Sequence, residues 1–295
     1  MNIRRLQEPC WRKQRETVRL MRLSSAVPRP LKSYEVEPSI YQFPDIFRRV
    51  HMEAPGDIER EVSFLEDVWR RHSKRPVRRV LDIACGNSPH GQIFARSRIE
   101  VAGVDRSPTM IAAGRSEAAG LKGLRFYRRR IEKFRLPEKS FDAAFFMSET
   151  FPIMTENRDI ITHLESVAAL VKREGLYCID IDYQSGIELV NTRSLWRERM
   201  VQVGNAQVEV REYHRPIEWH QAMHSVYELE CTIHFDDHLV ITRDVIPVRY
   251  ITPPLMDLIA RASRKFEMLA AYADLSLTRS IAQCYGRWLA VLRRT

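Results

Sequence analysis

The sequence predicts a doubly wound α/β fold, in which helices cover both faces of a parallel sheet. Two observations predict it. Short apolar runs alternate with helical patterns over residues 79–181, and a glycine-containing turn follows the first run. Such alternation is typical of parallel strands joined by right-handed crossovers. After Asp182 the runs become longer and alternate with period two, which indicates an antiparallel insertion after the fifth strand.

Each element has its own signal in the chain. Strands are expected at residues 79–84, 101–104, 124–128, 141–147 and 176–181. Helices are expected at 57–72, 90–98, 158–172 and 253–265, and one more begins at Ser107-Pro108, a typical N-cap and first helical residue. Period-two runs occupy 206–213, 226–235 and 239–250, with a hairpin turn at Asp236-Asp237. Two further strand-like runs cover 266–273 and 288–292.

Composition excludes several classes of protein. The 295 residues are 44% hydrophobic, yet no stretch reaches the roughly 18 consecutive apolar residues of a membrane span. The five cysteines are scattered without C-x-x-C spacing, which argues against disulfides and zinc and fits a cytoplasmic protein. The histidines of residues 214–238 lack convincing ligand spacing, so we expect no metal.

Charge and patterning divide the chain into four parts. Residues 1–33 hold nine basic and two acidic side chains, so +7 of the total net charge of +9 lies there. We expect a basic extension at 1–40, a core at 41–183, the antiparallel insertion at 184–250 as a lid or dimer surface, and the rest of the core sheet at 251–295. The extension is interpreted as a solvated tail or as sequence upstream of a true start at Met21. The alternative is an arm for nucleic acid or an anionic membrane.

The turn after the first strand carries the strongest functional signal. Gly86 ends that strand, where a glycine lets the backbone turn sharply and approach a ligand at the N-terminus of the next helix. Asp105 ends the second strand, and a carboxylate there can accept hydrogen bonds from both ribose hydroxyls. The sequence therefore predicts a nucleoside site at this edge of the sheet. Asp82 either belongs to that site or caps nearby backbone amides.

Four segments, residues 80–87, 103–110, 141–146 and 174–176, resemble the motif series of class I S-adenosylmethionine-dependent methyltransferases. The resemblance covers roughly residues 40–295. It implies a Rossmann-like, doubly wound seven-stranded sheet, S-adenosylmethionine as cofactor and S-adenosylhomocysteine as product. It also implies cofactor contacts for Asp82, Ala84, Cys85, Gly86 and Asn87 near the methionine moiety, Asp105 at the ribose, Arg106 and Met110 along the adenosine, Arg130 and Ile131 near adenine, and Met147 under the sulfonium.

Three positions depart from the family pattern. Ser88 stands where the turn usually has a second glycine, and its hydroxyl is expected to replace a water near the cofactor. Arg130 replaces an acidic residue that usually meets the adenine amine, and a guanidinium cannot accept that hydrogen bond. Glu149 lies in the segment after the fourth strand where related enzymes often have a histidine base.

Within the superfamily the chain is similar to aminosugar N,N-dimethyltransferases, both in the segment Phe43–Phe47 and in the antiparallel insertion. Glu149 is the expected base, because an amine must lose its proton to react. Tyr41 is assigned to the catalytic site, and Phe43 and Phe47 to the substrate site. These aromatic rings either cover the sulfonium or pack the first helix. Arg249 either binds an acidic substrate group or pairs with a carboxylate such as Asp244 or Glu230.

Three hypotheses of function follow. The first is a methyltransferase for a small molecule, at an amine or alternatively at a hydroxyl, with a homodimer expected through the insertion. The second is an RNA or protein methyltransferase that uses the basic extension and residues 128–130. Against it, the fourth strand lacks the Asn/Asp-Pro-Pro-aromatic sequence of base-amine methyltransferases, and residues 34–295 are nearly neutral. We therefore expect no nucleic acid partner. The third is a degenerate member that scaffolds a partner.

Overall fold

The computed structural model describes residues 17–18, 34–35, 39–51, 56–182, 193–216, 224–235, 239–284 and 286–295. Contacts divide the chain into two units. The larger unit comprises residues 54–187 and 249–295, and the smaller unit comprises residues 1–53 and 188–248. The expected hairpin turn at Asp236-Asp237 and most of the basic extension lie outside the described residues. Within the described residues no helix is long and apolar enough to cross a membrane.

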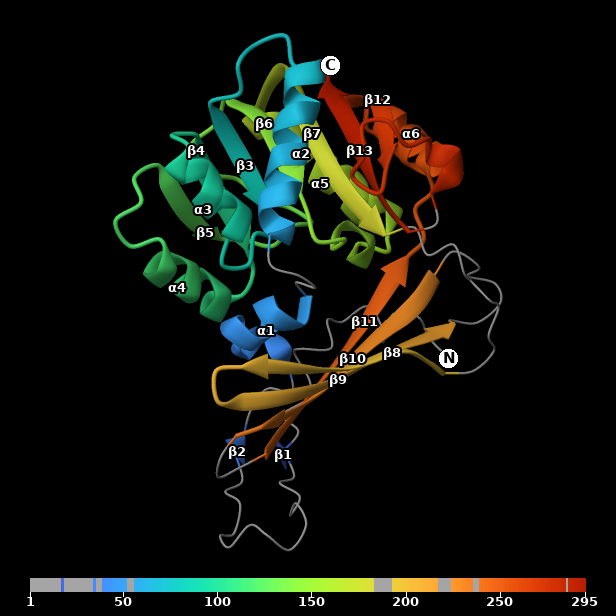
Figure 1. The fold of residues 1–295 in the computed structure, drawn as a ribbon. Helices are drawn as coiled ribbons and strands as arrows, with labels where there is room; N and C mark the ends of the chain where they lie inside the picture. The colour runs from blue at the N-terminus through green and yellow to red at the C-terminus, as the bar shows by residue number, and fades with distance from the viewer. Residues whose placement is uncertain are drawn as a thin grey trace, which may run out of the picture. The chain divides into compact units, whose positions relative to one another are not determined.

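A seven-stranded sheet forms the centre of the larger unit, in the order β12-β13-β7-β6-β3-β4-β5 (Figure 1). Its strands are β3 (Arg79–Ile83), β4 (Glu100–Asp105), β5 (Leu124–Arg128), β6 (Phe141–Phe146), β7 (Val171–Asp182), β12 (Phe266–Ala273) and β13 (Arg287–Arg294). The strands from β7 to β5 pair in parallel, whereas β13 is antiparallel to both β7 and β12. The predicted fold class is confirmed.

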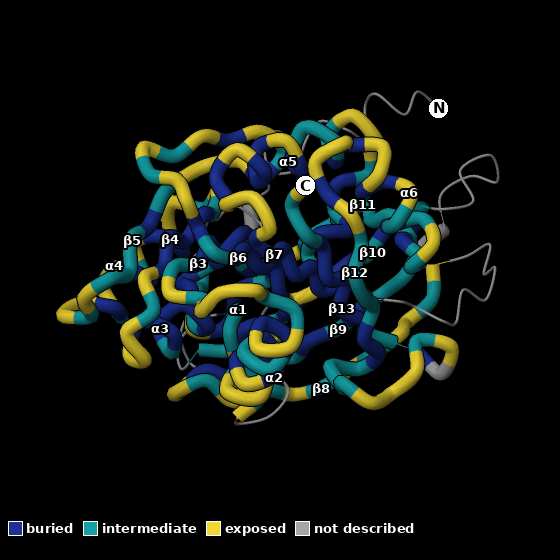
Figure 2. Tube along the Cα trace, turned by 90° about the horizontal axis from the view of Figure 1, so that it is seen from above, coloured by how far each residue is buried: buried dark blue, intermediate teal, exposed yellow. Residues whose placement is uncertain are grey.

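Helices cover both faces of this sheet (Figure 1). They are α2 (Asp57–His72), α3 (Pro89–Arg96), α4 (Pro108–Glu117), α5 (Asn157–Leu170) and α6 (Pro253–Ser263). Side chains alternate across a strand. In β3, Val80 therefore packs with α2 and α3, while Leu81 packs with α5 and α6. This double coverage explains why most residues of the middle strands β3 and β6, and of β7 from Gly175 to Ile181, are buried (Figure 2).

The order of the strands fixes where a ligand can bind. Strands β4 and β6 pair with opposite edges of β3, so the helices that follow β3 and β6 lie on opposite faces of the sheet. In sheets of this kind the crevice at the carboxyl ends of the strands, at this switch in direction, receives the ligand. The turn after β3, the end of β4 and the loop after β6 all lie at this edge.

The smaller unit contains a four-stranded antiparallel sheet in the order β11-β10-β9-β8. It is formed by β8 (Ser194–Val203), β9 (Ala206–Pro216), β10 (His224–His234) and β11 (Leu239–Arg249). The short helix η3 (Ile40–Gln42) and helix α1 (Pro44–His51) pack Ile40, Ile46 and Val50 into the same core as Val208 and Leu229. Contacts thus group residues 41–51 with the insertion, although we expected them in the core.

Two pairs of strands in the smaller unit were not predicted from the sequence. Strand β8 pairs with β9 through the tight turn at Gly204, whose φ of 55° is in the left-handed region that favours glycine. Near the N-terminus, β1 (Thr17–Val18) and β2 (Tyr34–Glu35) form a two-residue antiparallel pair.

Candidate cofactor and active site

Asp105 holds the turn after β3 against the start of α4. Its Oδ2 accepts a hydrogen bond from the Gly86 amide at 2.9 Å, and its Oδ1 accepts one from the Ser107 amide at 2.7 Å. Ala84 and Gly86 both have left-handed φ values, 53° and 54°, so the chain reverses within a few residues. One carboxylate therefore fixes both the turn and the N-terminus of the next helix.

The remaining acceptor capacity of Asp105 fits a ribose. Each carboxylate oxygen accepts one of these hydrogen bonds, the Arg106 backbone also hydrogen-bonds to the carboxylate, and the residue is partly buried. Burial raises the pKa of this carboxyl above its usual value, and the hydrogen bonds from Ser107 and Gly86 act in the opposite direction. A carboxylate has about four acceptor positions, so Asp105 can still accept from a ribose hydroxyl, and the residues present fit the nucleoside part of S-adenosylmethionine.

Ser88, which replaces the usual second glycine, points into the protein. The residue is fully buried, and its hydroxyl donates a hydrogen bond to Asp82 Oδ2 at 2.7 Å. Gly91 leaves the space for this hydroxyl, since a Cβ on Gly91 would lie 2.1 Å from Ser88 Oγ. The hydroxyl thus braces the turn from the inside. We expected this hydroxyl to replace a water near the cofactor. Its hydrogen bond runs to Asp82 inside the protein instead.

Three other residues of the turn region support its shape. Met110 is buried, and its Cε would lie 3.3 Å from a Cβ built on Gly86. The Asn87 side-chain amide donates to both carboxylate oxygens of Glu117, at 2.9 Å each. Cys85 is buried with Ile111, and burial raises the pKa of its thiol well above the usual value. This thiol packs in the interior, and its contact with the cofactor stays a prediction.

The residues expected near adenine differ in exposure. Arg106 and Arg130 are exposed, and Arg130 Nη2 donates to Glu132 Oε1 at 2.7 Å. Ile131 is buried, and its carbonyl lies 2.7 Å from His163 Nδ1. Burial lowers the pKa of His163 to about 4, so this histidine is neutral and donates from Nδ1 to that carbonyl. The buried histidine fixes the backbone of Ile131, the side chain assigned to adenine.

Glu149 follows β6 in a left-handed backbone conformation. Ser148 and Glu149 have φ values of 61° and 53°, and such non-glycine conformations each cost on the order of 1 kcal/mol. The Glu149 amide donates to Asp180 Oδ2 at 3.1 Å, which holds the loop in place. The side chain is 40% exposed, so it can meet a substrate. Met147, just before it, is buried in the core that contains α2.

A charged cluster that we did not expect surrounds Glu149, and we name it the Arg287 cluster. It consists of Glu61, His90, Glu149, Asp180 and Arg287. Arg287 binds Asp180 with two parallel hydrogen bonds of 2.8 and 2.6 Å, and its Nη1 lies 2.5 Å from Glu61 Oε1. Burial raises the pKa of Glu61, but His90 and Arg287 outweigh burial and hold it at about 2.

This cluster cannot be recognised from the sequence, because its members come from distant segments: α2, α3, the loop after β6, β7 and β13. One signal was present in the sequence. Asp180 interrupts the apolar run of residues 176–181, and a charge inside a buried strand requires a partner. The sequence does not say that the partner is Arg287, 107 residues further along.

The residues assigned to the substrate lie in both units. Arg249 Nη1 donates to Asn157 Oδ1 at 2.6 Å and to the Thr155 carbonyl at 3.4 Å, instead of to either carboxylate that we expected. Asp244, one of those two, accepts from the Ile40 amide at 2.9 Å. A contact of Arg249 with substrate stays a prediction.

The aromatic residues lie in the smaller unit and pack there. The rings of Tyr41 and Phe47 have centroids 4.7 Å apart, and Phe43 packs against the same core. This contact agrees with the packing interpretation. A role of these rings over the sulfonium stays a prediction.

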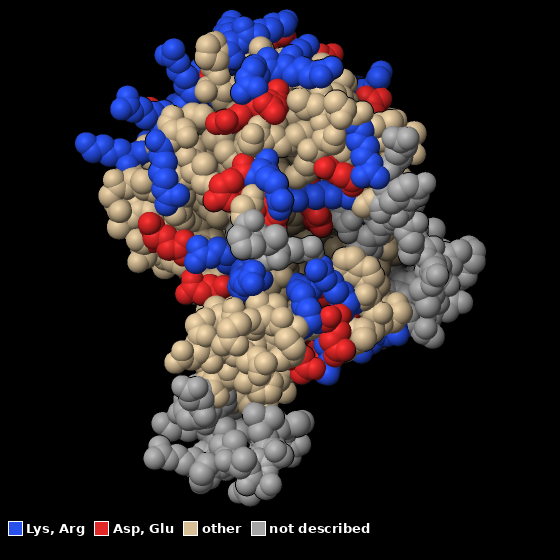
Figure 3. Space-filling view, viewed as in Figure 1, with Lys and Arg blue, Asp and Glu red and all other residues tan. Residues whose placement is uncertain are grey.

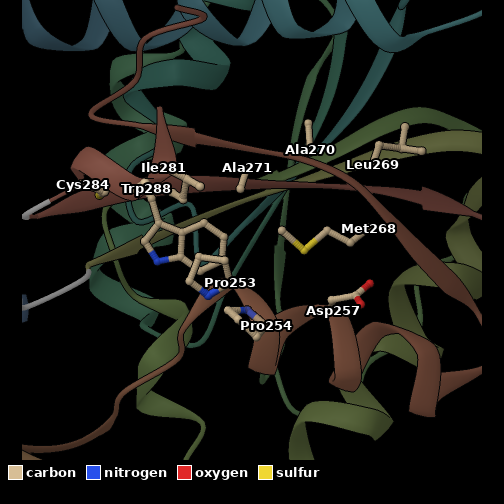
Figure 4. Close-up of a pocket in the computed structure, with 11 residues that line it drawn as sticks. Pro253, Pro254, Asp257, Met268, Leu269, Ala270, Ala271, Ile281, Cys284 and Trp288 are labelled. Carbon is tan, nitrogen blue, oxygen red and sulfur yellow. The ribbon is translucent and has the colours of Figure 1, made fainter. Parts of the chain in front are cut away.

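Other surface features lie away from the turn. A pocket of about 530 Å³ between α6 and the strands β12 and β13 is lined by Pro253, Met268 and Trp288 (Figure 4), and it contains no residue of the turn or of the Arg287 cluster. Exposed basic side chains such as Lys74 and Arg78 gather at the amino ends of the strands, opposite Asp105 (Figure 3). No metal-binding group occurs among the described residues.

The pairing of Ser88 with Asp82 predicts a pH effect on stability. Burial raises the pKa of Asp82 from 3.8 to about 7, so the folded state binds this proton more tightly than the unfolded state. The free energy of unfolding should therefore fall as the pH rises from about 4 to about 7. The contribution is about 4 kcal/mol at 1.36 kcal/mol per pKa unit. In urea unfolding, the free energy of unfolding of Asp82→Asn should increase relative to that of the wild type as the pH rises across this range. Parallel pH profiles of the two proteins would contradict this.

A family model matches the part of the chain that contains the turn after β3 and Asp105. Residues 80–175 match the model of a family described as a methyltransferase domain, Methyltransf_25. YqeM of Bacillus subtilis strain 168, which is named as a methyltransferase, is 24% identical over 113 residues, 38% of this chain and 46% of YqeM. The chain thus spans about half the length of the curated relatives it matches.

Solved structures share the fold over most of the chain. A S-adenosylmethionine-dependent methyltransferase from Clostridium acetobutylicum ATCC 824 has a TM-score of 0.69 and 12% identity, covering 85% of this chain and 97% of that one. The sugar N-methyltransferase KedS8 from Streptoalloteichus sp ATCC 53650 has a TM-score of 0.66 and 19% identity, covering 92% and 99%. The family model thus covers the first strands of the sheet and the turn after β3, and the solved structures share the fold of the chain.

Proposed function

We propose that this protein transfers a methyl group from S-adenosylmethionine to an amine of a small molecule. One observation carries the proposal. Asp105 joins the turn after β3 to α4 and is partly exposed at the edge of the sheet where nucleosides bind. The likeness to a sugar N-methyltransferase supports an amine as the acceptor.

The turn and its neighbours would hold the cofactor. Asp105 would accept hydrogen bonds from the ribose, and residues 84–87 would approach the methionine part through their backbone. Met110 and Ile131 are apolar and would contact the adenosine. S-adenosylmethionine supplies an electrophilic methyl group when bound.

Glu149 is suited to prepare the amine. An amine reacts through its lone pair, so it must be neutral, and a carboxylate within hydrogen-bond reach can orient it and accept its proton. Glu149 lies in the loop that follows β6, and its side chain is 40% exposed, so a substrate can reach it. Because methyl transfer is an in-line displacement, fixing the direction of the nitrogen matters as much as removing its proton.

The insertion offers a surface for a homodimer. Leu195, Trp196 and Met200 of the edge strand β8 are each more than half exposed, although they are large and apolar. Among the described residues β8 pairs with β9 alone, and an edge strand of this kind can pair with a second copy. We propose that the protein is a dimer through β8. Light scattering should give twice the chain mass for the wild type and one chain mass for Trp196→Glu. A wild-type monomer at micromolar concentration would exclude this dimer.

The cofactor site is tested by titration calorimetry with S-adenosylmethionine and with S-adenosylhomocysteine. Asp105→Ala removes two hydrogen bonds to a charged group, each worth about 1.5–3 kcal/mol, so affinity should fall at least about 100-fold. Asp257→Ala removes an exposed carboxylate of α6 that pairs with Arg261, and it should bind like the wild type.

Two outcomes of that titration would overturn parts of the proposal. Binding by Asp105→Ala equal to that of the wild type would place the cofactor elsewhere. No binding of either ligand by the wild type would exclude catalysis and favour a subunit that scaffolds a partner.

The role of Glu149 is tested by methyl transfer to a panel of small primary amines, aminosugars included. Glu149→Gln should lower kcat by about 10²–10⁴, the usual contribution of a general base, and leave the affinity for S-adenosylhomocysteine unchanged. Glu165→Gln, an exposed position on α5, is the matched control. An unchanged kcat would remove Glu149 from the mechanism. Methylation of hydroxyl compounds alone would replace the amine by an alcohol acceptor.

A further inference from the structure

Arg287 is the only residue of the Arg287 cluster that touches its three carboxylates, and each comes from a different part of the chain. Its guanidinium binds both oxygens of Asp180 in β7, at 2.8 and 2.6 Å. It also lies 2.5 Å from Glu61 of α2 and 3.4 Å from Glu149 Oε1. Arg287 itself begins β13, which pairs with β7. It therefore ties the proposed base to two rigid elements of the sheet domain.

Both the backbone and the side chain of Glu149 depend on this guanidinium. The Glu149 amide donates to Asp180 Oδ2, the same oxygen that accepts from Arg287 Nη2. The carboxylate of Glu149 meets Arg287 Nε directly. Ser148 and Glu149 are in left-handed conformations that non-glycine residues adopt only when neighbouring contacts hold them. Arg287 and Asp180 provide those contacts.

The charges in the cluster make a cation indispensable. Glu61, Glu149 and Asp180 are three carboxylates around one guanidinium, and Asp180 is fully buried. His90 of α3 donates to Glu61, because a carboxylate can only accept. Without Arg287, repulsion and burial would favour protonation of these carboxyls or departure of Glu149. A lysine would restore the charge but not the planar fork that binds Asp180 twice.

We propose that Arg287 is a positioning residue that holds Glu149 ionised and directed at the substrate, through Asp180 and by direct contact. The proposal rests on the function proposed above, in which Glu149 receives the proton of the amine. Arg287 touches neither cofactor nor substrate in this role, and it acts by fixing the geometry and charge of Glu149.

The first test needs no turnover. Hydrogen exchange measured by mass spectrometry on the full protein should show the Glu149 amide exchanging at least about 10-fold faster in Arg287→Gln, because its acceptor Asp180 loses its anchor. Arg287→Lys should give an intermediate rate. Arg261→Gln, which removes an exposed arginine of α6, should match the wild type. Unchanged exchange in segment 147–150 of the arginine variants would overturn the proposal. If Arg287→Gln does not fold, Arg287→Lys alone serves this comparison.

The second test separates positioning from a structural role. With the amine found in the screen, the acid limb of the kcat profile should move up by about one pH unit in Arg287→Gln, because the carboxylate of Glu149 loses its cation. In Arg287→Lys that limb should stay near the wild-type position while kcat falls. The double variant Arg287→Gln/Glu149→Gln should have the same kcat as Glu149→Gln alone, because Arg287 acts only through the Glu149 carboxylate. Additive losses with unmoved pH profiles would show a merely structural arginine.

The two tests keep this inference separate from the proposed function. If the wild type binds S-adenosylhomocysteine and methylates an amine, but the exchange and pH results fail, only the role of Arg287 is wrong. If the wild type binds neither ligand, the proposed function fails, whereas the exchange measurement still decides whether Arg287 holds the loop.

Discussion

The hydrogen bonds from two backbone amides to Asp105 are the interaction on which the candidate site depends. They connect the turn that ends β3 with the first turn of α4, so two neighbouring parallel strands present one continuous backbone surface. Beneath that surface, the Ser88 hydroxyl and the buried Asp82 brace the same turn from the protein interior. The turn is therefore held from both sides.

A series of charged side chains connects the cofactor turn with the substrate side of the proposed site. His90 lies in the first turn of α3, directly after the cofactor turn, and it contacts Glu61, which in turn contacts Arg287. Arg287 then reaches Asp180 and Glu149 at the ends of β7 and β6. Buried charges of this kind are costly to leave unpaired, which makes the arrangement specific. One row of charged contacts thus links the two halves of the proposed site.

Local patterns predicted most of the larger unit and its turn. Strands β5 and β12 occupy the residues expected from their apolar runs, and α4 begins at Ser107-Pro108 as its cap predicts. The position of Asp105 follows from the same logic, because a strand end is visible in the chain. The Arg287 cluster could not be predicted, because it is assembled by the pairing of β13 with β7 and by the packing of α2. Strand β8 was missed because charged residues interrupt its alternation.

The most direct measurement is a crystal structure of the protein grown with S-adenosylhomocysteine. The account predicts the ligand at the carboxyl ends of β3 and β4, with both ribose hydroxyls hydrogen-bonded to Asp105 and the backbone of Gly86 against the methionine part. It also predicts Glu149 still held by Asp180 and Arg287, with a carboxylate oxygen facing the sulfur end of the ligand. A ribose bound away from Asp105, or a Glu149 side chain turned away from that sulfur, would contradict the account.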